Sequence, residues 1–240
     1  MKLKILSWNI WGGQHLPEIL ELLEREKPDV IGLQEVIEDL DGANNTARTI
    51  AERLGYEWFF YPTYEVDTGR LYHLLEPRTV RMGNAILSKP KIAKTEVHQL
   101  SEEKGRFAVG AIIPLGGREF RFYSTHLKHT HQKPEELQNA QAQSLVKLMP
   151  KENAILMGDF NATPESDCLA IINGGTMKNT DAKLKPTWSV YPEGCPICKP
   201  QKLDTRLDYL FASKDLKTDS FTIYDSKGSD HLPISVVLKI

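Results

Sequence analysis

The chain is poor in cysteine and has no long apolar run. Its 240 residues include three cysteines, Cys168, Cys195 and Cys198. An odd and low number of cysteines is a poor disulfide framework, so a reducing compartment is expected. No apolar stretch is long enough to cross a bilayer, and the N-terminal segment lacks the apolar core and small-residue cleavage site of a secretory signal. We therefore expect a cytoplasmic protein without stable membrane insertion.

Positive charge is not in excess either. The formal net charge is -2 and the isoelectric point is about 6.4. Proteins that bind long duplex DNA tightly are usually basic, because neutralised phosphates supply much of the affinity. The balance here favours brief, local contact with a nucleic acid. The length suits one large domain or two small ones, and no repeat or linker divides the chain, so we expect a single domain over residues 1–240 and a monomer.

Short apolar runs alternate with helical patterns. Residues 3–8 and 30–34 flank an amphipathic segment at 17–25, which predicts a β-α-β unit with parallel strands. A helix predicted at 134–149, opening at Pro134, leads into a strand at 153–158. We predict further strands at 56–61, 83–88, 92–98, 106–113, 118–125, 207–212, 219–224 and 233–239, helices at 46–54 and near 164–172, and an irregular segment at 174–203. The pattern predicts an α/β fold with two sheets face to face and helices outside.

Acidic, amide or imidazole side chains follow several of these apolar runs. They are Asn9 in SWNIWGG, Glu35 in VIGLQEV, Asp159 and Asn161 in AILMGDFNATP, and Asp230 and His231 in GSDHLP. A fold that gathers these strand ends would collect oxygen ligands and an imidazole around one point. Such clusters bind Mg²⁺ or Mn²⁺ and act on phosphate esters. The ordinary alternative for each segment alone is a polar turn.

One acidic residue is predicted inside a strand. Asp208 lies between apolar neighbours in TRLDYLF, where an unpaired carboxylate would be costly. The imidazole of His231 is its natural partner. The alternative is a salt bridge to Arg206.

Three histidines close together raise the question of zinc. FYSTHL places His126 at the end of a strand, and His129 and His131 follow. No second cluster of soft ligands is evident, so we predict a solvated loop for His129 and His131. The segment CPIC has the spacing of a zinc knuckle, but it is half a site. No CxxC or HxxxH pair matches it, so a reduced loop is predicted there.

The ordered motifs resemble the endonuclease/exonuclease/phosphatase superfamily, which includes deoxyribonuclease I, exonuclease III-type repair enzymes, neutral sphingomyelinases and inositol-polyphosphate 5-phosphatases. The matches are WN at Trp8–Asn9, LQE at Leu33–Glu35, GNAILS at Gly83–Ser88, THL at Thr125–Leu127, GDFN at Gly158–Asn161, LDYLF at Leu207–Phe211 and SDH at Ser229–His231. They follow the order of the family over residues 8–231. The resemblance implies a four-layer α/β sandwich of two mixed sheets flanked by helices.

The resemblance also implies a metal site and a means of activating water. Glu35 would be the principal ligand of Mg²⁺ or Mn²⁺. Asn9 and Asp230 would complete the surroundings of the metal, directly or through water. Asp159 would orient or deprotonate the attacking water. His231, paired with Asp208, would help to activate water or would stabilise the phosphorane-like transition state. Which of Asp159 and His231 acts as the base stays open.

Three residues would bind phosphate by the same resemblance. Asn161 would hold a phosphate oxygen, and Arg106 matches a commonly basic position, where a guanidinium can bind phosphate with two hydrogen bonds. A surface salt bridge is the alternative for Arg106. His126 would bind phosphate or protonate the leaving oxygen, with Glu76 as the expected carboxylate behind it. His126 stands where repair endonucleases usually carry an Asn-x-Tyr motif, which argues against abasic-site repair.

The implied activity is a Mg²⁺-dependent phosphodiesterase that acts on DNA or RNA. One alternative keeps the chemistry but takes a phospholipid, sphingolipid or sugar phosphate, as a phosphatase or phospholipase C-type hydrolase would. Another alternative is a non-enzymatic binding module with the same fold. A binding module predicts gaps among the catalytic positions, and the sequence has none.

Overall fold

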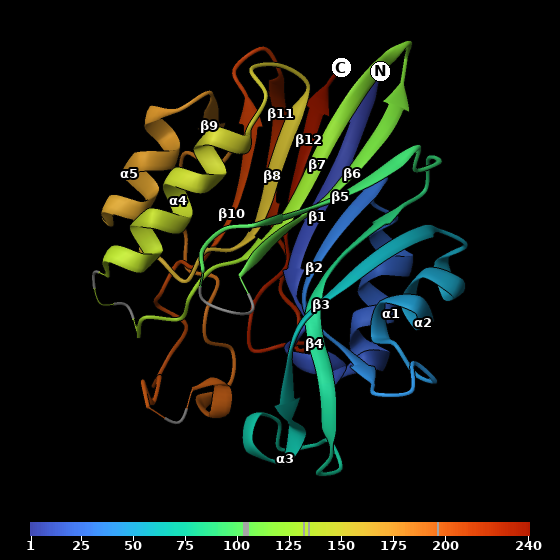
Figure 1. Cartoon of the computed structure of the whole chain (residues 1–240), viewed down its shortest axis with the longest axis vertical. Helices are drawn as coiled ribbons and strands as arrows, with labels where there is room; N and C mark the ends of the chain where they lie inside the picture. The colour runs from blue at the N-terminus through green and yellow to red at the C-terminus, as the bar shows by residue number, and fades with distance from the viewer. Residues whose placement is uncertain (103–105, 132, 134, 196) are drawn as a thin grey trace.

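The structure, a computed structural model, describes residues 1–240 except 103–105, 132, 134 and 196. Within the described residues, twelve strands form two six-stranded sheets that lie face to face, and helices cover their outer sides (Figure 1). The predicted α/β sandwich with helices outside is therefore confirmed.

The strands and helices have the following bounds. The first sheet has the order β11 (Lys217–Ile223), β12 (Ile234–Lys239), β1 (Lys2–Asn9), β2 (Val30–Asp39), β4 (Thr79–Ser88) and β3 (Glu57–Asp67). The second has the order β5 (Lys94–Gln99), β6 (Phe107–Leu115), β7 (Arg118–His126), β8 (Ala154–Asp159), β10 (Asp208–Ser213) and β9 (Met177–Asn179). The helices are α1 (Leu16–Glu26), α2 (Thr46–Leu54), α3 (Thr68–Leu71), α4 (Glu136–Leu148) and α5 (Asp167–Gly174), with 3-10 turns at Trp11–Gly13 and Pro192–Gly194. Both sheets are mixed, because β1 with β2 and β7 with β8 pair in parallel, whereas the other pairs are antiparallel.

Alternation along the strands builds three apolar layers. On β1, Leu3 and Ile5 face the core between the sheets, whereas Leu6 and Trp8 pack beneath α1 and α2. A third core joins the outer face of the second sheet to α4 and α5. The helix pairs thus lie on opposite sides of the sandwich, as Figure 1 shows.

The helix boundaries follow from local sequence. The side chain of Asn45 accepts a hydrogen bond from the backbone N–H of Arg48 at the start of α2, and Gly55 ends the helix in a left-handed conformation. The predicted bounds 46–54 are confirmed. The expected opening of α4 at Pro134 lies outside the described residues, and the described helix begins at Glu136. Among the residues that the structure describes, no helix is both long and apolar enough to cross a bilayer.

The inner faces of the strands turn polar at one edge of the sandwich. Asn9 ends β1 on the face of Ile5, which points between the sheets. Asp159 ends β8, and its register partners on the neighbouring strands are Asp208 of β10 and His126 of β7. Strand alternation and register therefore bring these four polar side chains to one place.

A β-bulge places Glu35 at the same edge. The register of β2 against β4 shifts between Leu33 and Val36, and Glu35 has a φ of 53°. Leu33 and Val36 both pack on the helix-covered side. In a regular strand Glu35 would point to that side too, but the extra residue of the bulge turns it toward the site.

An ion pair between α1 and β1 is expected to stabilise the fold in a pH-dependent way. Lys4 Nζ lies 2.7 Å from Glu26 Oε2, and the hydrogen bond from Lys4 lowers the pKa of Glu26 to about 2. The pair is partly exposed, so Glu26→Gln is expected to cost about 1 kcal/mol of unfolding free energy at pH 7. Because the folded pKa is depressed, this contribution is present above about pH 4.5 and is lost as the pH falls toward 2.

Urea unfolding at pH 7 and at pH 3 measures this difference. The gap between wild type and Glu26→Gln is expected to be smaller at pH 3. Glu24→Gln is the matched control, because Glu24 pairs with the exposed Arg53 from a more exposed position on the same helix. Equal costs for the two variants, or a gap that does not change with pH, would contradict the assignment.

Candidate active site

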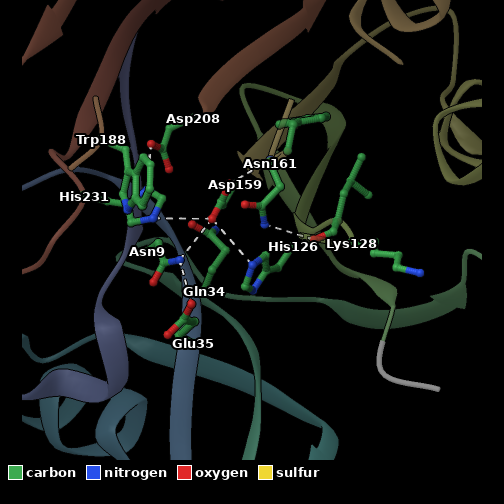
Figure 2. Close-up of polar contacts among 12 residues, drawn as sticks. Asn9, Gln34, Glu35, His126, Lys128, Asp159, Asn161, Trp188, Asp208 and His231 are labelled. Atoms are coloured by element: carbon green, nitrogen blue, oxygen red, sulfur yellow. Dashed lines mark hydrogen bonds and ion pairs between the residues drawn. The ribbon is translucent and has the colours of Figure 1, made fainter. Parts of the chain in front are cut away.

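Asp159 is the centre of a buried polar network (Figure 2). Its Oδ2 lies 3.6 Å from His231 Nε2 and 3.5 Å from His126 Nε2. The Asn9 amide donates to the same oxygen at 3.1 Å, and the backbone N–H of Asn161 donates to Oδ1 at 2.8 Å. One carboxylate at the end of β8 is therefore contacted by both imidazoles.

Close approach of two strands brings this carboxylate into position. Gly158 precedes Asp159, and a Cβ at Gly158 would lie 1.9 Å from the carbonyl oxygen of Thr125 on β7. The glycine is thus required by the packing of β8 against β7. Gly158 lies within β8, as the strand predicted at 153–158 implies.

Asp208 orients His231. Its Oδ2 lies 2.9 Å from His231 Nδ1 and accepts a hydrogen bond from Thr187 Oγ1 at 2.6 Å. The imidazole therefore donates through Nδ1 and presents Nε2 to the site. Arg206 does not pair with this carboxylate. Its guanidinium donates to the backbone carbonyl of Asp208 and to Asp181, so the expected pairing with His231 is confirmed and the salt-bridge alternative is wrong.

Glu35 and Asp230 face a common cavity beside this network. Asn9 Nδ2 donates to Glu35 Oε1 at 3.1 Å, and the Tyr72 hydroxyl donates to Oε2 at 3.2 Å. Trp188 Nε1 donates to Asp230 Oδ2 at 2.9 Å. Neither carboxylate forms an ion pair with a lysine or arginine of the described residues. Two such carboxylates, with the phenol oxygen of Tyr72 nearby, suit a hard divalent cation.

Burial and mutual charge set the protonation of these groups. Burial raises the pKa of Asp159 to about 7. Burial, together with the neighbouring charge of Glu35, raises the pKa of Asp230 to about 6. Burial opposes the charge on His231, but Asp208, Asp159 and Asp230 together raise its pKa well above the ordinary value. The charges of Glu35 and Asp230 repel each other, which favours binding of a cation between them.

His126, Arg106 and Asn161 line the other side of the cavity. Burial lowers the pKa of His126 well below its usual value, and the charge of Arg106 adds to this effect. His126 is therefore neutral at pH 7 and has one N–H to donate. Arg106 donates to the backbone carbonyl of His126 at 3.3 Å and makes no ion pair within the described part of the chain. The Asn161 amide donates to the carbonyl of Leu127 at 3.1 Å.

All nine residues that the sequence nominated converge on this network or line its cavity. They are Asn9, Glu35, Arg106, His126, Asp159, Asn161, Asp208, Asp230 and His231. Glu76 does not lie behind His126. It is exposed, and Asp159 is the carboxylate that faces this imidazole. Residues from near both ends of the chain therefore meet at one site, as Figure 2 shows for Asn9 and His231.

Three supporting residues were not predicted in their observed roles. Tyr72 and Thr187 hold carboxylates of the site, and no local motif marks either of them. Trp188 fixes Asp230 through the hydrogen bond that its indole N–H donates. Their contacts arise from loops whose paths the sequence pattern does not define.

Two sequence predictions near the site are wrong. His129 and His131 are half-buried and lie against Cys198, so they do not form a solvated loop. The CPIC segment is therefore not half a site, because the two histidines face Cys195 and Cys198. These partners have neither CxxC nor HxxxH spacing, because the two histidines are two residues apart.

The cavity has a volume of about 290 Å³. Its apolar lining includes Trp11, Leu71, Met82, Trp188, Ile197 and Leu207. Arg70 and Arg106 are the basic residues of the lining other than histidine. The site is thus a compact pocket with acidic and imidazole groups at its base.

Comparison with known proteins agrees with this geometry. A model of the Endonuclease/Exonuclease/phosphatase family matches residues 6–231. Exodeoxyribonuclease III of Haemophilus influenzae is 33% identical over 165 residues, which cover 68% of this chain and 58% of that protein. This chain therefore spans less than two thirds of that relative.

Solved structures share the fold. An endonuclease/exonuclease/phosphatase family protein from Leptotrichia buccalis superposes with a TM-score of 0.78 at 20% identity, over 99% of this chain and 100% of that chain. A mannosyl-6-phosphatase of Bacteroides thetaiotaomicron superposes with a TM-score of 0.73 at 19% identity, over 99% of this chain and 100% of that chain. At these identities the likeness concerns the fold alone.

Two facing mixed sheets carry a buried site of carboxylate, imidazole and amide groups at one edge, a set of groups suited to chemistry on phosphoric esters. The chain belongs to the endonuclease/exonuclease/phosphatase family. Enzymes of this family typically depend on a metal ion, and the buried group of Asp159, Asp208 and His231 places ligand atoms within 4.8 Å of one another.

Proposed function

We propose that the protein is a Mg²⁺-dependent phosphodiesterase that cleaves nucleic acid. The convergence of His126, His231 and Asn9 on the Asp159 carboxylate carries this proposal. In-line displacement at phosphorus needs an oriented water, charge neutralisation and a donor for the phosphate oxygens. The site offers a group for each of these needs.

Asp159 is proposed to accept the proton of the attacking water. Its raised pKa of about 7 makes it a stronger base than an exposed aspartate, and it is ionised above that pH. His231, protonated through its contact with Asp208, is proposed to stabilise the negative charge that develops on phosphorus oxygens. This division of roles follows from the opposite preferred charges of the two groups.

Phosphate is proposed to lie between these groups and the opposite cavity wall. The neutral imidazole of His126 and the amide of Asn161 would donate to its oxygens, and Arg106 would add a positive charge. Leu127 accepts from Asn161 and so fixes the orientation of the amide. Binding phosphate suits His126 better than proton donation to a leaving oxygen, because its pKa is lowered in the free protein.

Glu35, Asp230 and Asn9 would hold Mg²⁺, directly or through water. The oxygen-rich character of this set and the mutual repulsion of Glu35 and Asp230 fit a hard cation. When bound, the ion would neutralise charge on the phosphate as a Lewis acid.

Nucleic acid is the proposed substrate because the relative with 33% identity is named as an exodeoxyribonuclease. The net charge of -2 provides little electrostatic attraction for long duplex. A compact pocket also suits a phosphate near a chain end or in a single strand. We therefore propose terminal or single-stranded DNA or RNA as the preferred form.

The second candidate is a phosphate ester of a small sugar or lipid. The compact cavity with its apolar lining favours it, because its volume suits a small ligand. The two candidates share the chemistry of the site and differ only in what lies beyond the phosphate.

A substrate panel decides between them. The purified chain is incubated with Mg²⁺ and end-labelled single-stranded and duplex DNA and RNA, bis-p-nitrophenyl phosphate, sugar phosphates and sphingomyelin. Nucleic-acid cleavage is expected to be lost with EDTA and to return with excess Mg²⁺. Asp159→Asn, purified in parallel, reports any contaminating nuclease. Turnover of small esters without any cleavage of nucleic acid would exclude the nuclease and favour the second candidate.

A further inference from the structure

Two loops beside the active-site cavity bring four metal-binding side chains together. One loop follows β7 and carries His129 and His131, and the other follows the 3-10 turn at Pro192–Gly194 and carries Cys195 and Cys198. One ligand atom from each residue lies within 4.8 Å of the other three. We call these four residues the His–Cys cluster. It shares no residue with the proposed Mg²⁺ site.

We propose that the His–Cys cluster is a structural zinc site with four protein ligands. Two thiolates and two imidazoles are a preferred ligand set of zinc, and soft sulfur ligands disfavour Mg²⁺. The site is thus chemically distinct from the oxygen-rich group around Glu35.

The distances are close to those of a tetrahedral site. His131 Nδ1 lies 3.2 Å from Cys198 Sγ and 3.8 Å from Cys195 Sγ. His129 Nε2 lies 3.6 Å from Cys198 Sγ and 2.9 Å from His131 Nδ1. Zinc with bonds of about 2.3 Å to sulfur and about 2.0 Å to nitrogen spaces tetrahedral ligands about 3.3–3.8 Å apart. Small movements of one imidazole would therefore complete the geometry.

The backbone prepares both halves of the cluster. The N–H of Cys198 donates to Cys195 Sγ at 3.1 Å, a hydrogen bond that favours a thiolate and fixes its direction. His131 has a φ of 53°, a left-handed conformation that is uncommon for residues other than glycine. Such conformations persist where the surroundings hold them, and a bound ion would do so here.

Four protein ligands leave no open position for a substrate or water, so the site is structural. A zinc ion bound by the His–Cys cluster would affect the wall of the active-site cavity. His129, His131 and Cys195 line the cavity wall, and the exposed Ile197 lies between the two cysteines. Zinc would join two loops that are more than 60 residues apart and fix the wall next to His126.

Metal analysis of the full chain tests this proposal. The protein is expressed with added zinc, purified without chelator and analysed by inductively coupled plasma mass spectrometry. We expect about one zinc per chain in the wild type, with four-coordinate binding. The double variant Cys195→Ser/Cys198→Ser is expected to lose it. Cys168→Ala is the matched control, because Cys168 is buried in the core outside the cluster and its removal should leave zinc content unchanged.

Cobalt replacement identifies the ligands independently of stoichiometry. Co²⁺ in the chelator-treated wild type is expected to give the intense visible bands of a tetrahedral ion and a thiolate charge-transfer band. Zinc should displace both. This measurement needs only the wild type, so it decides the question even if the double variant fails to fold. It also excludes zinc held by the carboxylates of the active site, since these supply no sulfur.

Three results would overturn the proposal. The first is zinc content that is unchanged in the double variant. The second is a cobalt spectrum without the thiolate band. The third is zinc-free wild type in which mass spectrometry finds Cys195 and Cys198 joined as a disulfide. None of these readouts depends on catalysis, so failure of the nuclease proposal would leave them unaffected.

Discussion

Glu35→Gln is expected to lower kcat/KM for phosphodiester hydrolysis by about 10²–10³-fold, because the site loses an electrostatic partner of the transition state. It is also expected to raise the Mg²⁺ concentration needed for half-maximal activity. The bulge in β2 turns this side chain toward Asn9 and Tyr72, which contact one carboxylate oxygen each. Glutamine keeps the size of the side chain but removes the charge that would bind the cation.

Mg²⁺ titrations of both proteins on the same substrate measure this effect. Glu65→Gln is the matched control, because Glu65 is exposed on β3 and lies outside the cavity lining. Its kcat/KM and Mg²⁺ dependence should equal those of the wild type. Wild-type Mg²⁺ dependence in Glu35→Gln would remove Glu35 from the metal site, whatever the loss in rate.

The inner edge of the sandwich could be predicted from the sequence because strand alternation is strict. Asn9 and Asp159 end buried strands, and each lies an even number of residues from apolar residues that point between the sheets. Strand alternation therefore places both on the same inner face. The partnership of Asp208 with His231 followed from the cost of an unpaired buried carboxylate. The position of Glu35 depends on a bulge between Leu33 and Val36, and neither bulged residue is a glycine or proline that would have indicated it.

The rest of the site depends on irregular segments. Thr187 and Trp188 belong to the segment at 174–203, where periodicity gives no information about the path of the chain. The same segment brings Cys195 against His131, whose partner histidine is only two residues away. Three-residue β9 was also missed there, because three residues are too few to show alternation.

Asp208→Asn is expected to lower kcat by about 10²–10³-fold, the usual cost of losing one electrostatic partner of the transition state. In the wild type, activity should rise as Asp159 loses its proton near pH 7 and fall when His231 loses its proton at higher pH. Burial opposes the charge on His231, and Asp208 is the largest of the influences that raise its pKa. Without that carboxylate the imidazole deprotonates sooner, so the alkaline limb of the profile should move to lower pH.

The pH dependence of kcat at saturating Mg²⁺ separates this role from a loss of folding. Circular dichroism of Asp208→Asn at each pH of the profile checks that the fold is retained. Asp204→Asn is the matched control, since Asp204 is exposed four residues before Asp208 and pairs only with Lys202 among the described basic residues. An alkaline limb that stays in place in Asp208→Asn would mean that the charge on His231 does not take part in the reaction. Asp159 alone would then have to account for the pH dependence of proton transfer from the attacking water.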